Sequence, residues 1–274
     1  MVRIKSIEEI QNFTCFIRSL RKGLITNFYL NVEKHSIWIE TGEFFVHETP
    51  ECIFFLHENG NFYHLFFTAT STDSLCAALQ KASFCNELLS IDILGAKENV
   101  VKDALVNIGF YEYKSLYRMY HIGYPLQYEM EKIADMATIK DIDEIYHILN
   151  QDFDPLSEQI PTKGELALAI SKKEILIFRA ESKIKGLILF ELSKLNMYLR
   201  FWWVDKMYRN QHIGAFLYHS LMNLAKGTKR QMHWVISTND NAIKRYKHYG
   251  YIAESLYDLS LIHISEPTRQ EAIS

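Results

Sequence analysis

The sequence predicts an α/β protein with two domains, and three observations support this prediction. A chain of 274 residues is long enough for two domains of ordinary size, each with its own core. Its composition, 48% hydrophobic and 14% aromatic, is typical of globular proteins. Segments with the alternation of strands are interspersed with segments that have the 3.6-residue spacing of helices. The chain is therefore expected to build sheets flanked by helices.

The first half of the chain contains a series of strand candidates. They are expected at Ser36–Glu48, Cys52–Thr70 and Leu88–Gly95. The sequence ENGN inside the second of these is typical of a hairpin turn. A helix capped by Ser71 or Thr72 is expected to follow the hairpin.

In the second half of the chain, a polar turn at Tyr208–Phe216 follows an aromatic, β-branched run. Apolar residues downstream recur at helical spacing, which predicts a helix from about Gln211 to about Lys226. The first turn of a helix has unpaired N–H groups and partial positive charge, so it attracts anions. Gly214 lets a ligand approach this backbone, and Arg209 adds charge. Together these features predict a phosphate-binding turn.

A second motif lies downstream, at Ser237–Tyr251. Asn239 is a favourable N-cap, and Gly250 suits the left-handed position that ends many helices. Ala242, Ile243 and Tyr246 share one face of the helix between them. The sequence thus predicts a short helix after a strand.

These two motifs, in this order, resemble those of the GCN5-related N-acetyltransferase (GNAT) superfamily. The resemblance covers Lys132 to about Asp258 and includes an expected hairpin at Glu174–Leu192, with a tight turn near Ser182. It implies an α/β (α+β) fold of two tandem GNAT-like domains, each a mixed, mostly antiparallel sheet flanked by helices. It also implies acetyl-CoA as acyl donor, with its pyrophosphate on the turn and its pantetheine on the preceding strand.

Carried over residue by residue, the resemblance assigns Tyr246 as the catalytic proton donor to the leaving thiolate. The implied acetyl-CoA site comprises Trp203, Val204, Arg209, Asn210, Gln211, His212, Ile213, Gly214, Ala215 and Asn239. Trp203 and Val204 would offer backbone groups to the pantetheine and the thioester oxygen. His212 is a departure, because the family usually has glycine there. A histidine in the first turn of a helix is sterically allowed.

The end of each half carries similar residues, which suggests an internal duplication. Gly109-Phe110 corresponds to Gly250-Tyr251, and Ser115-Leu116-Tyr117 recurs as Ser255-Leu256-Tyr257, about 140 residues later. Tyr246, however, corresponds to Leu105 in the first copy.

The first copy is therefore expected to have kept a fold and lost the cofactor site, because Thr68–Leu79 also has no arginine and no glycine turn. We expect a structural or acceptor-pocket domain at 1–124 and the acetyltransferase domain at 125–258. The boundary is expected in the Gly- and Pro-containing segment His121–Lys132.

Three functions fit this reading. The first is transfer of an acetyl group from acetyl-CoA to a primary amine of a small molecule or an amino acid derivative. The second is aminoacyl transfer of the peptidoglycan-bridge type, which should require a basic surface for tRNA. The third is a non-catalytic acyl-CoA sensor. The general base, which Glu191 or a water chain would supply, stays open, as do the acceptor, the preferred acyl-chain length and the oligomeric state.

Net charge and cysteine content limit which partners and which cellular compartment are expected for the protein. A net charge of −3 and a pI near 6.4 give no case for binding nucleic acid or an anionic membrane. No apolar run approaches the roughly 20 residues that span a bilayer, so a cytoplasmic protein is expected. The cysteines have no C-x-x-C pairing and are expected to be reduced and mostly buried, and no metal site is predicted.

The end of the chain reads as foreign sequence. Leu259–Arg269 resembles the translation of a sequencing adapter. We therefore expect the genuine sequence to stop near Asp258, with 259–274 a non-native tail. Its apolar alternation can imitate a strand, but Glu266 onward should have no partner and fray.

Overall fold

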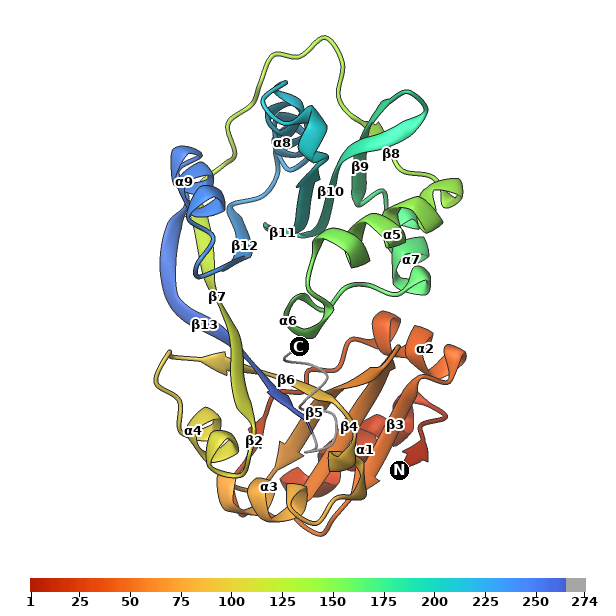
Figure 1. Ribbon diagram of the computed structural model, residues 1–274, viewed down its shortest axis with the longest axis vertical. Helices are drawn as coiled ribbons and strands as arrows, with labels where there is room; N and C mark the ends of the chain where they lie inside the picture. The colour runs from red at the N-terminus through yellow and green to blue at the C-terminus, as the bar shows by residue number, and fades with distance from the viewer. Residues whose placement is uncertain (265–274) are drawn as a thin grey trace. The chain divides into compact units, whose positions relative to one another are not determined.

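The computed structural model describes residues 1–264 and divides into two compact units (Figure 1). The first unit consists of Met1–Ser115 and the chain from Leu256 onward, and the second consists of Leu116–Ser255. The predicted domain boundary at Tyr124 lies just after a strand that runs across the division at Ser115.

The first unit contains a mixed sheet in the order β1-β3-β4-β5-β6-β13, with β2 added on β5. Its strands are β1 (Val2–Arg3), β2 (Ile25–Thr26), β3 (Phe44–Glu48), β4 (Cys52–Asn59), β5 (Phe62–Ala69), β6 (Leu89–Gly95) and the later part of β13 (Ile252–His263). Its α-helices are α1 (Ile7–Ser19), α2 (Val32–Thr41), α3 (Thr72–Leu79) and α4 (Val100–Asn107).

Successive residues of β4 point to opposite faces of this sheet, as in any strand. Phe54 and Leu56 pack in a core with residues of α3 and α4, whereas Ile53 and Phe55 pack in a core with residues of α1 and α2. The sheet is thus covered on both faces, which explains the continuous apolar run that the sequence shows here.

The strand expected at Ser36–Glu48 is wrong in its first part, because Ser36–Thr41 belongs to helix α2. The helix starts where the side chain of Asn31 accepts a hydrogen bond from the N–H of Lys34. It stops at Gly42, whose φ of 77° only glycine adopts at no steric cost. These capping residues outweigh the apolar alternation on which the strand was predicted.

The second unit contains a mixed sheet in the order β7-β12-β11-β10-β9-β8. Its strands are β7 (Tyr111–Ile122), β8 (Asp135–Met136), β9 (Ile175–Ala180), β10 (Lys183–Ser193), β11 (Asn196–Val204) and β12 (Arg230–Ile236). Its α-helices are α5 (Ile142–Asp152), α6 (Pro155–Glu158), α7 (Lys163–Ser171), α8 (Ile213–Leu224) and α9 (Asp240–His248). Residues of α5 and α7 pack on one face of this sheet and residues of α8 and α9 on the other (Figure 1).

The predicted fold class is confirmed, because both sheets are mixed and mostly antiparallel and helices flank them. Each unit has one parallel pair, β5 with β6 in the first and β11 with β12 in the second. The order strand, helix, strand, helix, strand runs as β5-α3-β6-α4-β7 and again as β11-α8-β12-α9-β13. Gly109 and Gly250 end the corresponding helices with positive φ angles of 105° and 82°. This correspondence supports the internal duplication.

The expected foreign tail begins inside a strand. Leu259 and Leu261 of β13 are buried in the core of the first unit. Its residues up to His263 pair with β6. These contacts do not test where the sequence comes from, so the tail stays a prediction, and Glu266 onward lies outside the described residues.

Within residues 1–264, no helix is long and apolar enough to cross a membrane. The same part of the chain has no group of three or more His, Cys, Asp or Glu placed to hold a metal ion. The four cysteines are free thiols, but the expectation that most are buried is wrong: only Cys52 is buried, and Cys15 is exposed.

Candidate functional site

The parallel strands β11 and β12 pair over a short distance and then separate. Their register runs from Asn196 opposite Arg230 to Leu199 opposite His233. Beyond these residues β11 continues to Val204 beside β10, and β12 continues to Ile236 beside β7. An opening between two neighbouring strands results, and it leaves backbone N–H and C=O groups on the facing edges available to a ligand.

A β-bulge lies on β11 where this opening starts. Leu199 pairs with Phe190 and Phe201 pairs with Leu189, so Arg200 is the extra residue. A bulge reverses which side chains point to which face. As a result, Leu199 and Trp202 both pack on the α8 side of the sheet, although they lie three residues apart.

The two adjacent tryptophans therefore have different surroundings. Trp203 packs in the core beneath α5 and α7, where its indole Nε1 donates a hydrogen bond to Asp152 at 2.8 Å. Trp202 stacks on Tyr218, with ring centroids 5.3 Å apart. The guanidinium of Arg245 lies 5.6 Å from the ring centroid of Trp202. The N–H of Asp205 donates to Lys185 of β10, so by strand alternation the N–H and C=O of Trp203 point toward Leu187 of β10, and those of Val204 face the opening.

The turn that follows β11 leads to the start of α8. Asp205 accepts a hydrogen bond from the N–H of Met207 at the start of this turn. Arg209 donates from Nε to the carbonyl oxygen of Val204 at 3.3 Å, and Asn210 has a φ of 65°. Helix α8 begins at Ile213, two residues later than predicted, so Gln211 lies in the turn.

The N-cap of α8 is His212, and its side chain makes no capping hydrogen bond. Gly214 and Ala215 follow in the first turn, half-buried. The amide groups of this turn therefore lack the usual side-chain acceptor, and an anion can take its place.

The expectation that His212 is helical is wrong, because its φ is 59°, in the left-handed region. This conformation costs about 1 kcal/mol or more for a residue with a Cβ and nothing for glycine. His212→Gly should therefore raise the free energy of unfolding by about 1 kcal/mol in urea titrations. Asn210→Gly is the matched control and should gain less, since asparagine tolerates this region. A less stable His212→Gly protein would show that the imidazole makes a stabilising contact that outweighs the strain.

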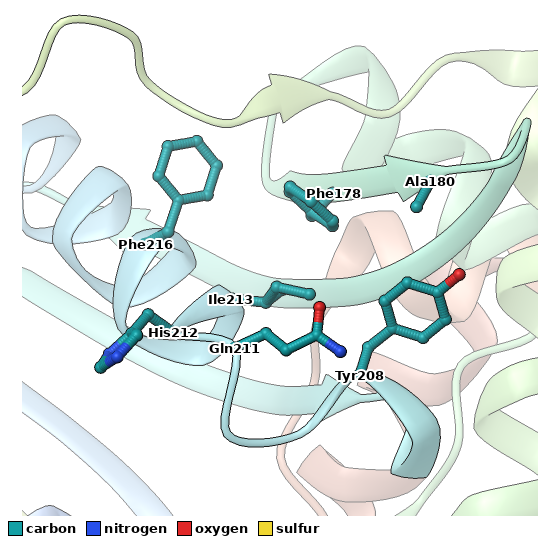
Figure 2. Close-up of a pocket in the computed structure, with 7 residues that line it drawn as sticks. All are labelled: Phe178, Ala180, Tyr208, Gln211, His212, Ile213 and Phe216. Carbon is teal, nitrogen blue, oxygen red and sulfur yellow. The ribbon is translucent and has the colours of Figure 1, made fainter.

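A pocket of about 280 Å³ adjoins the turn (Figure 2). Aromatic rings from β9, the turn and α8 surround the side chains of Gln211 and Ile213 in this view. The lining residues are Phe178, Ala180, Tyr208, Gln211, His212, Ile213 and Phe216. A flat or apolar part of a ligand whose phosphates lie on the turn can enter this pocket.

Helix α9 presents Tyr246 at the other side of the strand opening. Asn239 caps the helix as expected, accepting the N–H of Ala242 at 3.1 Å. The ring of Tyr246 lies 3.5 Å from that of His233, centroid to centroid, and 5.9 Å from that of Trp202. Burial raises the pKa of the Tyr246 phenol, so the hydroxyl is protonated at neutral pH and can donate but not accept a proton.

Two residues of this site, His233 and Arg245, were missed in the sequence. His233 is 1% exposed, burial lowers its pKa to about 3, and neither ring nitrogen has a hydrogen-bond partner among residues 1–264. The indole Nε1 of Trp202 is also buried without a partner in this part of the chain. The guanidinium of Arg245 lies at the start of α8 beside Trp202, since its Nη1 is 3.5 Å from where a Cβ of Gly214 would be. Arg245 directly precedes Tyr246, and this adjacency was the one available signal.

The acidic side chains of the segment Asn150–Pro161 have local hydrogen-bond partners. Asp152 accepts from Trp203, and Asp154 caps α6 by accepting the N–H of Leu156. Glu158 accepts the N–H of Asp154 at 2.9 Å. Glu191, the possible base, lies 3.5 Å from Arg200 in an ion pair.

Comparison with known proteins shows which family this part of the chain resembles. Residues 142–251, which include every predicted site residue, match the Acetyltransferase (GNAT) family. The chain therefore carries a GNAT domain. No curated protein sequence matches the chain.

Solved structures resemble the whole chain, not the GNAT domain alone. An acetyltransferase from the GNAT family of Colwellia psychrerythraea is 13% identical, over 96% of this chain and 98% of that one, with a TM-score of 0.54. A tandem GNAT protein from the clavulanic acid biosynthesis pathway is 6% identical, over 95% and 97% of the two chains, with a TM-score of 0.56. A GCN5-related N-acetyltransferase from Kribbella flavida is 12% identical, over 86% and 96%, with a TM-score of 0.54. At these identities the likeness shows that the whole chain shares their fold, and it shows no activity.

Proposed function

We propose that the protein transfers the acetyl group of acetyl-CoA to a primary amine of a small molecule or an amino acid derivative, by direct attack of the amine. The observation that carries this proposal is the opening between β11 and β12, which lies between the uncapped start of α8 and the phenol of Tyr246. An acyl-CoA has the matching order of groups: phosphates, an amide-bearing arm and a thioester.

The residues present fit such a ligand. The turn Asn210–Ala215 offers backbone amides to the pyrophosphate, and Arg209 and Arg245 supply positive charge. The buried Nε1 of Trp202, 3.6 Å from where a Cβ of Gly214 would lie, is a donor that lacks an acceptor among residues 1–264. A buried donor without a partner costs about 1–3 kcal/mol, and a bound ligand removes that cost.

In this proposal, bound acetyl-CoA supplies an activated acyl group, and the chain orients it. The backbone of Val204 beside the opening holds the pantetheine and donates to the thioester oxygen as negative charge develops there. Tyr246 donates a hydrogen bond to the departing sulfur. Asn239 fixes the start of α9 and thereby the position of Tyr246. The acceptor is expected to approach past Asn150–Pro161.

Trp202→Phe tests the fit of the site. The aromatic stack on Tyr218 is kept while the indole N–H is lost, so the Kd for acetyl-CoA should rise about tenfold at unchanged stability. Trp234→Phe, a like change on β12, should leave the Kd unchanged. Isothermal titration measures both, and equal affinity of the Trp202→Phe and unmodified proteins would remove this donor from the site.

Release of free CoA thiol in the presence of a panel of amines tests the reaction. Amine-dependent thiol release supports the acetyltransferase. Binding of acetyl-CoA without turnover on any amine would favour the sensor. Failure to bind acetyl-CoA, with transfer from an aminoacyl-tRNA, would favour the aminoacyl transferase. We also propose a cytoplasmic location, because the free thiols fit a reducing compartment.

A further inference from the structure

The first unit has an opening between strands like the one in the second. Its parallel strands β5 and β6 pair only at Tyr63 with Leu89 and at His64 with Ser90. Strand β5 continues to Ala69 and β6 to Gly95. The duplication thus preserved the separation of the parallel pair that, in the second unit, forms the proposed acyl-CoA site.

A segment of the chain itself lies in this opening. Strand β2 pairs antiparallel with the separated part of β5, Ile25 opposite Ala69 and Thr26 opposite Thr68. The N–H of Asn27 then donates to the carbonyl oxygen of Phe67 at 3.3 Å. The edge of β5 that faces the opening is therefore already hydrogen-bonded.

The side chain of Asn27 joins the two separated strands. Its Nδ2 donates to the carbonyl oxygens of Leu65 on β5, at 3.2 Å, and of Asp92 on β6, at 3.1 Å. Its Oδ1 accepts the N–H of Phe67 at 2.6 Å. One carboxamide thus makes three hydrogen bonds with backbone groups on both sides of the opening.

The segment also passes from one face of the sheet to the other. Ile25 packs against the core of α3 and α4, whereas Phe28 is buried in the core of α1 and α2. The ring of Phe28 stacks on Phe55 with centroids 4.3 Å apart. Because Asn27, between these two residues, is hydrogen-bonded to both β5 and β6, the passage runs through the gap between the strands.

The turn after β5 is also covered, by the same segment and by a helix cap. Gly23 has a φ of 107°, and a Cβ there would lie 2.7 Å from the carbonyl oxygen of Thr70, so the segment touches this turn with its backbone. The start of α3 is satisfied by a capping box, in which Ser71 and Ser74 each accept the other's N–H. In the second unit the corresponding helix start has no such side-chain cap.

We propose that Gly23–Phe28 is a built-in occupant of the first unit's strand opening and takes there the place that acyl-CoA takes in the second unit. The segment follows the path of the proposed ligand, from the turn along the strand and through the gap, and it offers amide groups of the kind that pantetheine carries. The first unit accordingly binds no acyl-CoA, and each chain binds one. The stoichiometry rests on the proposed function; the occupancy of the opening does not.

Titration calorimetry with acetyl-CoA and with CoA tests the stoichiometry on the full chain. One site per chain is expected, and none in Gly214→Glu, which blocks the second unit. Two sites per chain, of which one remains in Gly214→Glu, would overturn the proposal. Absence of binding in the unmodified protein would refute the proposed function, and the occupancy is then decided by hydrogen exchange.

Hydrogen exchange tests directly, without any ligand, whether Gly23–Phe28 fills the opening. The amide of Phe67 should be protected in the unmodified protein and should exchange at least about tenfold faster in Asn27→Ala, together with amides of both β5 and β6. Asn99→Ala, which removes only the cap of α4, is the control and should affect α4 alone. An unprotected Phe67 amide, or a response to Asn27→Ala no wider than in the control, would show that the segment does not fill the opening.

Discussion

Gly214→Glu is expected to abolish acetyl-CoA binding while the protein without ligand keeps its stability. A Cβ at Gly214 would have ordinary contacts of 3.5 Å with Trp202 and with Nη1 of Arg245, so the backbone has room for a side chain. The carboxylate would lie near Arg245 and the uncapped amides of α8, where it takes the place of the phosphates. Negative charge at a helix start is stabilising.

Two measurements check this result. Isothermal titration should give no heat with acetyl-CoA, and the thermal midpoint of the free protein should be equal to or above that of the unmodified protein. Gly214→Ala is the matched control, because it adds the Cβ without charge and should weaken binding much less. If the glutamate variant bound acetyl-CoA with unchanged affinity, the turn before α8 would not be the phosphate site.

Local features of the second unit could be predicted because single residues determine them. Glu181 and Ser182 form the expected tight turn between β9 and β10, with φ angles of 53° and 62°, as a two-residue hairpin requires. Asn239 caps α9 and Gly250 ends it, for reasons of hydrogen bonding and backbone sterics that act within a few residues.

Features that depend on distant contacts could not be predicted. The bulge at Arg200 decides that Trp202 and not Trp203 points toward α8, and it follows from the register with β10. The buried position of His233 under Tyr246 follows from how α9 packs on β12. Asn27 shows no pattern in the sequence, because its partners Leu65, Phe67 and Asp92 lie on two other strands.

Tyr246→Phe is expected to lower kcat about a hundredfold or more and to leave the affinity for acetyl-CoA nearly unchanged. Proton donation by a positioned side chain contributes roughly 10² to 10⁴ in rate, and this change removes only the hydroxyl. The ring keeps its place on His233, so the site keeps its shape. The phosphate and pantetheine contacts lie on β11 and the turn after it, which accounts for the unchanged affinity.

The first unit provides the matched control for this substitution. Leu105, the counterpart of Tyr246, is fully buried in α4, and Leu105→Met conserves its volume at a cost below about 1.5 kcal/mol. Steady-state kinetics of both variants should show a loss of kcat in Tyr246→Phe alone. Full kcat in Tyr246→Phe would assign this tyrosine to the aromatic core around His233. A large loss of kcat in a stable Leu105→Met protein would mean that the first unit takes part in turnover, since a scaffold tolerates a change that conserves volume.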